Sequence, residues 1–167
     1  MSDLHDKIVG IIAELCRDSE RGSGRPYYKE IYADHTKGFE KKPLAIILVR
    51  RGKSLIQNYY PDVWAEYPRG GMDVFEVWHS ESEPEAINDI VLPAMVKGIK
   101  YLHIVCTGYK ISGDKAKELV DLLLNKLHNS RGNYLLPPKN VYIVDIPEKI
   151  HKNRAKIESR LSEQLKI

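Results

Sequence analysis

The spacing of apolar residues along the N-terminal third of the chain predicts one helix followed by a loop. An amphipathic helix is expected over residues 3–20, because apolar side chains recur there at intervals of three and four: Leu4, Ile8, Ile11, Ile12 and Leu15. The segment 21–26 contains two glycines and a proline, which predicts a loop. Residues 27–42 mix polar and aromatic side chains without a clear period, so no element is predicted there.

Short apolar runs predict strands in the rest of the chain, and helical spacing predicts the segments between them. The expected strands are 44–50, a bent strand 54–67 interrupted at Pro61, 72–79, 101–106 and 141–146. The expected helices are 84–98, with Ser82 as its cap, 115–128, and a last charged helix opened by Pro147.

The resulting order of elements is αβββαβαβα. Strands separated by helices of this length pair in parallel, whereas strands joined by tight turns pair in antiparallel fashion. We therefore predict an α/β fold with a mixed sheet and helices on both faces, built as a single domain over residues 1–167.

Composition narrows the class of protein. The chain has 167 residues, of which 43% are hydrophobic and 29% charged, which is typical of one folded domain. No segment reaches the roughly 18 consecutive apolar residues that a membrane helix needs. The N-terminus lacks a signal-sequence pattern, and Cys16 and Cys106 match no metal or redox spacing. We expect a cytoplasmic protein without a membrane partner.

The formal net charge of +3 is unevenly distributed. Residues 60–90 contain eight Asp and Glu against one basic residue, so this segment carries −7 and the remainder +10. A basic body with an acidic island is typical of a protein that holds a cation near a polyanion. A solvated acidic hairpin and helix start would give the same pattern without any ligand.

Within the acidic segment, Asp62 opens one strand and Glu76 lies on the next. Two carboxylates side by side across a hairpin can share Mg²⁺, which takes one or two protein carboxylates plus water and phosphate. A two-residue turn at 69–70 would place position 62 opposite 77 and put Glu76 on the other face. The shared site therefore needs an odd loop or a bulge, for which Gly70 and Gly71 are suited. Otherwise Asp62 caps a turn and Glu76 points outward.

The motif formed by Pro61-Asp62 and Glu76-Val77-Trp78 resembles that of the PD-(D/E)xK nuclease superfamily, which includes restriction endonucleases and archaeal Holliday-junction resolvases. The resemblance implies a restriction-endonuclease-like αβββαβ core over about residues 3–106, followed by a C-terminal αβα extension over about 107–167. It also implies that Asp62 and Glu76 bind Mg²⁺ or Mn²⁺ to cleave DNA, and that a helix-one acid such as Glu14 supports the site.

The chain departs from that family at the third position of the motif, where Trp78 replaces a lysine. The indole N–H is a single neutral donor and cannot supply the positive charge of a lysine. Either catalysis is lost, or a lysine from another element takes the role. The candidates are Lys97, as the third catalytic residue beside Asp62 and Glu76, and Lys53 in the first hairpin.

Basic and aromatic residues interleave after the first helix, and Arg21, Arg25 and Lys29 are candidates for nucleic-acid binding. Covering the edge of the sheet is an equally good role for this segment. Three hypotheses follow: a metal-dependent nuclease that acts on DNA, a non-catalytic nucleic-acid-binding or assembly module of the same fold, and an α/β domain of a protein complex without nucleic acid. A homodimer is compatible with each.

Overall fold

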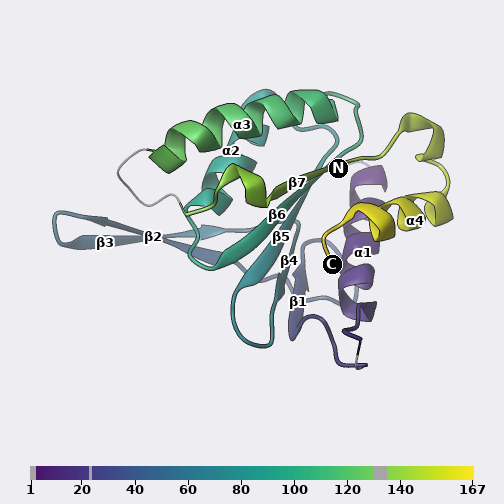
Figure 1. Cartoon of the computed structure of the whole chain (residues 1–167), viewed down its shortest axis with the longest axis horizontal. Helices are drawn as coiled ribbons and strands as arrows, with labels where there is room; N and C mark the ends of the chain where they lie inside the picture. Colours follow the sequence, from purple (N-terminus) through teal and green to yellow (C-terminus); the bar gives the residue numbers. More distant parts are fainter. Residues whose placement is uncertain (1–2, 23, 130–134) are drawn as a thin grey trace.

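A computed structural model describes residues 3–22, 24–129 and 135–167 of the chain (Figure 1). The N-terminal half contains α1 (Asp3–Asp18), β1 (Glu30–Ala33), β2 (Leu44–Arg50), β3 (Lys53–Tyr59), β4 (Val63–Glu66), β5 (Met72–Trp78) and α2 (Glu83–Ala94). The C-terminal half contains β6 (Ile99–Cys106), α3 (Gly113–Asn129), the 3₁₀ turn η1 (Pro138–Asn140), β7 (Val141–Asp145), the 3₁₀ turn η2 (Glu148–Ile150) and α4 (Arg154–Gln164).

A five-stranded mixed sheet in the order β1-β4-β5-β6-β7 forms the centre of the fold. Strand β4 runs antiparallel to both β1 and β5, whereas β5, β6 and β7 are parallel. The parallel strands are connected through α2 and α3, as the sequence pattern predicts. The predicted α/β class, with a mixed sheet and helices on both faces, is confirmed (Figure 1).

Each face of the sheet has its own hydrophobic core. Phe75 and Val77 of β5 pack into the core shared with α1 and α4. Val74 and Trp78, at alternate positions, pack into the core shared with α2 and α3. Burying one large apolar side chain contributes about 1.5–3 kcal/mol, so both faces of β5 are strongly stabilised.

The predicted bent strand 54–67 is wrong, because its two halves belong to different sheets. Strand β3 pairs only with β2 in a separate two-stranded hairpin, while β4 lies in the main sheet. Pro61 separates them and has no N–H to donate to a ladder. The antiparallel part of the main sheet is completed instead by β1, from the segment in which the sequence pattern predicts no element.

Two predicted helix boundaries also change. Helix α2 has the expected Ser82 cap, with a capping box to Glu85, but it ends one residue after Pro93 and does not reach Gly98. The last segment forms η2 after Pro147, and α4 begins only after Asn153, whose side chain accepts a hydrogen bond from the Lys156 N–H. Among the described residues, no helix combines the length and apolar character needed to cross a membrane.

Candidate functional site

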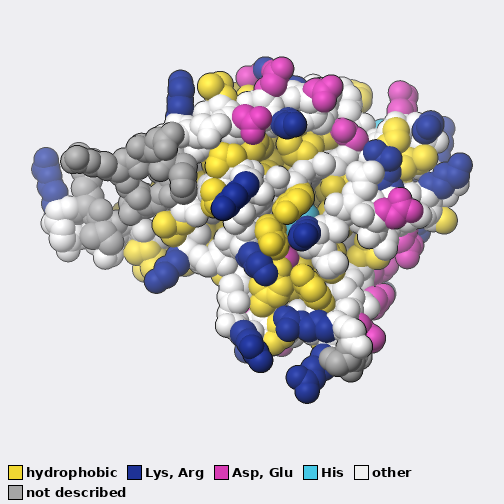
Figure 2. Space-filling view, in the orientation of Figure 1, with side chains coloured by type: hydrophobic (Ala, Val, Ile, Leu, Met, Phe, Trp, Pro, Cys, Tyr) yellow, Lys and Arg dark blue, Asp and Glu magenta, His cyan; other side chains and the backbone are white. Residues whose placement is uncertain are grey.

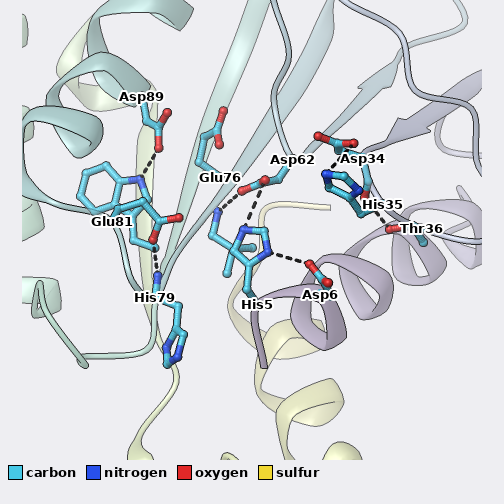
Figure 3. Close-up of polar contacts among 12 residues, drawn as sticks. His5, Asp6, Asp34, His35, Thr36, Asp62, Glu76, His79, Glu81 and Asp89 are labelled. Atoms are coloured by element: carbon cyan, nitrogen blue, oxygen red, sulfur yellow. Dashed lines mark hydrogen bonds and ion pairs between the residues drawn. The ribbon is translucent and has the colours of Figure 1, made fainter. Parts of the chain in front are cut away.

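The polar residues of interest gather at the edge of the sheet where the parallel strands end. Strand β4 runs in the opposite direction, so its first residues lie at the same edge as the end of β5. The N-terminal turn of α1 reaches this edge too, because His5 Nε2 lies 3.4 Å from Asp62 Oδ1 (Figure 3). The carboxyl ends of parallel strands are a common place for ligand sites.

The loop between β4 and β5 sets which residues face each other. The Tyr67 N–H donates to the Gly71 carbonyl at 3.0 Å, so three residues, 68–70, form the loop. Gly70 and Gly71 both have positive φ, +93° and +84°, which glycine adopts at low cost. With Val63 opposite Phe75, position 62 comes opposite position 76 rather than 77. The odd loop required for a shared site is therefore present.

The side chains of Asp62 and Glu76 line the same cavity. Asp62 Oδ2 also accepts a hydrogen bond of 2.8 Å from the Val77 N–H. Glu76 is only 4% exposed and accepts a hydrogen bond from the hydroxyl of Tyr59. Glu76 is therefore a buried residue with a hydrogen-bond partner and not an outward, solvated one.

These carboxylates line an open cavity of about 250 Å³. Its described lining residues include no lysine or arginine and are Tyr60, Asp62, Glu76, Glu81, Glu85, Asn88 and Asp89. Burial raises the pKa of Glu76, and the charges of Asp89 and Asp62 raise it further. Burial and the nearby Asp62 and Glu81 raise the pKa of Asp89 to about 8. Figure 3 shows Asp62, Glu76, Glu81 and Asp89 around one space, where a bound cation would relieve their repulsion.

Trp78 occupies the face of β5 that also carries Glu76. Its side chain is 2% exposed, and its Nε1 donates a hydrogen bond of 3.0 Å to Asp89 Oδ2. The position at which the family that the motif resembles has a lysine is therefore occupied here by a packed aromatic ring, which supplies one neutral donor.

Two histidines, His5 and His79, lie next to residues of the acidic cavity in the chain's fold. Burial lowers the pKa of His5, but its hydrogen bond with Asp62 and the charge of that residue outweigh burial and raise the pKa to about 9. His79 turns away from the carboxylates, and its Nδ1 lies 2.7 Å from Thr107 Oγ1 (Figure 3). His79 and His151 line a second cavity of about 230 Å³. The sequence pattern did not single out His5, since only the sheet topology brings helix one to Asp62.

The structure does not bring the other predicted site residues to Asp62 and Glu76. Glu14 pairs with Arg154 of α4 at 2.9 Å and is half exposed. Lys97 precedes the start of β6 at Ile99. The residue of β6 that lies opposite Glu76 is Ile104, and the strand rises by about 17 Å from Ile99 to Ile104. The reason is that α2 runs back against the strands and ends at the opposite edge.

The other basic candidates also lie elsewhere, both the alternative catalytic lysine and the residues predicted to bind nucleic acid. Lys53 is at the far end of the β2–β3 hairpin. The Lys29 N–H donates to the carbonyl of Glu66, the last residue of β4, which places Lys29 at the edge opposite Asp62. Arg21 and Arg25 are bonded to each other through their backbones in the loop after α1. These residues remain candidates for a contact with a long polyanion, but not for the acidic cavity itself.

Within the described parts of the chain, no group of three or more His, Cys, Asp or Glu residues has an arrangement that would hold a metal ion. The carboxyl groups of Asp62 and Glu76 have hard oxygen atoms, the kind of ligand that Mg²⁺ or Mn²⁺ takes together with water and substrate oxygen. No family model matches this chain, and no curated protein and no solved structure does either.

Proposed function

We propose that this chain is a metal-dependent, nuclease-like protein of the PD-(D/E)xK type that acts on DNA phosphodiesters. The observation that carries the proposal is the position of Asp62 opposite Glu76, which follows from the pairing of β4 with β5. Both line an acidic cavity in which the described lining residues include no lysine or arginine. Such a cavity favours a divalent cation over any neutral ligand.

The order of elements supports the same proposal. Along the chain, α1, β1, β4, β5, α2 and β6 follow the sequence helix, three antiparallel strands, helix, strand. The β2–β3 hairpin is then an insertion between the first and second strands of that core. Asp62 stands just before the second of these strands, and Glu76 lies in the third.

The residues around the pair have defined roles in this proposal. Tyr59 holds the Glu76 carboxyl by donating its hydroxyl hydrogen, and the Val77 N–H fixes Asp62. His5 places a positive imidazolium beside Asp62 at the rim. A cation bound by Asp62 and Glu76 supplies Lewis-acid polarisation of a phosphodiester and activation of water.

One observation favours a second candidate function, a non-catalytic nucleic-acid-binding or assembly module of the same fold. Trp78 is packed into the core and tied to Asp89, so it provides neither the charge nor the mobility of a lysine. Loss of one electrostatic group of this kind commonly costs about 10²–10³ in rate. The proposed nuclease is therefore slow, or it has kept the cation site and lost catalysis.

The test combines a binding measurement with an activity measurement. Mn²⁺ should raise the melting temperature of the wild type, because a ligand that binds only the folded state stabilises it. Asp62→Asn should abolish this rise, whereas Asp121→Asn on the exposed face of α3 should keep it. Cleavage of supercoiled, linear and branched DNA is then measured with Mg²⁺ and Mn²⁺.

A melting shift with metal-dependent cleavage supports the nuclease, and a shift without cleavage supports the non-catalytic module. The absence of both a shift and any cleavage in the wild type would overturn the proposal.

A further inference from the structure

The β2–β3 hairpin lies outside the main sheet and projects from the body of the protein (Figure 1). Every residue of β3 except Tyr59 is exposed. Ile47 and Ile56 face each other across the hairpin and are 57% and 67% exposed, and Leu55 is 64% exposed. A two-stranded hairpin is marginally stable alone in water, and neighbouring exposed apolar side chains are typical of a binding surface.

The hairpin and its flanking residues carry charge of one sign only. Residues 41–60 contain five basic residues and no Asp or Glu: Lys41, Lys42, Arg50, Arg51 and Lys53. The space-filling view shows a dark blue side chain at the far end of the hairpin and no magenta one on the part coloured by type (Figure 2). This +5 segment directly precedes the −7 segment that forms the acidic cavity. The two charges are thus segregated along the chain.

The base of the hairpin is part of the acidic cavity. Tyr59, the last residue of β3, donates its hydroxyl hydrogen to Glu76. The next residue, Tyr60, lines the cavity and is 48% exposed. The Nζ atom of Lys41 lies 4.9 Å from the centre of the Tyr60 ring. A molecule held along the hairpin would therefore pass directly to the carboxylates.

We propose that the β2–β3 hairpin is an arm that binds duplex DNA, with its basic end on the phosphates and the Ile47–Ile56 pair against the bases or sugars of a groove. Pairing with the same hairpin of a second copy is unfavourable, because two +5 segments would repel each other. A polyanion matches this charge, and two-stranded ribbons fit into the grooves of DNA and insert apolar side chains there. The claim that the arm leads DNA to a cleavage site rests on the proposed function, whereas the claim that the arm binds DNA does not.

The turn of the hairpin allows a clean test. Arg51 and Gly52 form the loop between the paired residues Arg50 and Lys53, and both have positive φ, +51° and +73°. Asn-Gly is the preferred pair for such a turn, so Arg51→Asn removes a charge while it eases the backbone. Loss of binding in an Arg51→Asn/Lys53→Gln variant is then not caused by a disrupted hairpin.

The experiment measures fluorescence anisotropy of a labelled DNA duplex in EDTA over a series of KCl concentrations. Each phosphate contact contributes about 0.9 to the slope of log affinity against log salt. The Arg51→Asn/Lys53→Gln variant should therefore lose roughly two from the slope. The matched control Lys117→Gln/Lys126→Gln, on the exposed face of α3, should keep the wild-type slope. Thermal melting of all variants checks the fold.

Three results would overturn the arm. The first is a wild type that does not bind the duplex at low salt, and the second is an Arg51→Asn/Lys53→Gln variant with wild-type affinity and slope. The third is a wild type that self-associates without binding DNA and becomes monomeric on Ile47→Thr/Ile56→Thr substitution, which assigns the surface to a second copy. Failure of Mn²⁺ to shift the melting temperature would remove the cation site and leave the salt result standing, so the two proposals fail separately.

Discussion

The indole Nε1 of Trp78 donates a hydrogen bond of 3.0 Å to Oδ2 of Asp89, and this bond links the β5 strand to α2 beside the acidic cavity. The bond holds Asp89 within electrostatic range of Glu76, whose pKa is raised by burial and by that same carboxylate. A neutral donor thus holds Asp89 near Glu76, at the position where the family that the motif resembles has a lysine.

Trp78→Lys tests whether the tryptophan at this position prevents catalysis. If the site is otherwise intact, metal-dependent cleavage should rise about 10²–10³ above the wild-type level, and Asp62→Ala should abolish the gain. Loss of the buried ring costs several kcal/mol, about 3–5 for a large aromatic side chain, so circular dichroism must show that the variant is folded. Strong wild-type cleavage that Trp78→Lys leaves unchanged would contradict this prediction. Lys97→Ala should not affect cleavage, given its place at the opposite edge.

Tyr59→Phe should destabilise the protein through Glu76. Tyr59 is 4% exposed, and its hydroxyl is the donor to the buried carboxyl. Leaving a buried polar group without its partner costs about 1–3 kcal/mol. The neighbouring Tyr60→Phe is the matched control, since that ring is 48% exposed and its loss of a hydroxyl should change stability by less than about 0.5 kcal/mol. Urea unfolding measures both, and equal effects would show that the Tyr59 hydroxyl does not hold Glu76.

His103 should make the protein acid-sensitive. Its ring is buried against Phe75, with centroids 4.4 Å apart, and its Nε2 accepts a hydrogen bond from the Lys166 N–H. Burial lowers the pKa of His103 from 6.5 to about 3. Between these two pKa values the imidazole is protonated in the unfolded chain but neutral in the folded chain. The free energy of unfolding therefore falls as the pH drops from about 6.5 toward 3, by about 1.4 kcal/mol per pH unit.

His103→Phe should remove this part of the pH dependence while costing about 1–3 kcal/mol at pH 7 through the unpaired Lys166 N–H. Chemical denaturation between pH 4 and pH 7 measures the slope, and a variant of the exposed His35 is the control for loss of an imidazole. An unchanged slope in His103→Phe would assign the acid sensitivity to other groups.

Substitution of glycine by alanine should change the stability of the protein in opposite directions at two positions. Gly71→Ala forces a side chain onto a backbone with φ of +84°, which costs about 1–2 kcal/mol. Gly10→Ala lies in the middle of α1 with open space around the new Cβ, so it should stabilise the protein by up to about 1 kcal/mol. Denaturant midpoints of the two variants compare them directly. Stabilisation by Gly71→Ala would mean that the turn does not need its left-handed conformation.

The local patterns that predicted elements correctly are those in which one face of a helix or strand is buried. Helix α1 follows from its apolar stripe, and α2 follows from the Ser82 cap and Pro84 at its first turn. Strand β1 was not predicted, because it is four residues long and lies at the sheet edge, where the sequence shows neither strict alternation nor a continuous apolar run.

The candidate site shows the same division between local and long-range information. The pair Asp62 and Glu76 is visible in the sequence because it lies in one hairpin, and the glycines at 70 and 71 already indicate the odd loop. The roles of His5 and Asp89 depend on which helix covers which strand end, and the sequence pattern alone does not contain that packing. Lys97 lies far from the site for a similar reason, because α2 runs back against the strands and ends at the opposite edge of the sheet.

The loop of residues 68–70 makes this site unusually intolerant of changes in chain length. Surface loops generally accept insertions and deletions because little depends on their length. Here one residue gained or lost would shift the pairing of β4 with β5 by one position and turn Glu76 away from Asp62, while the apolar residues of β5 would exchange faces. A length change of two residues would keep each side chain on its present face of the sheet. Among descendants of this chain that keep the site, natural length variants of the loop should therefore differ by even numbers.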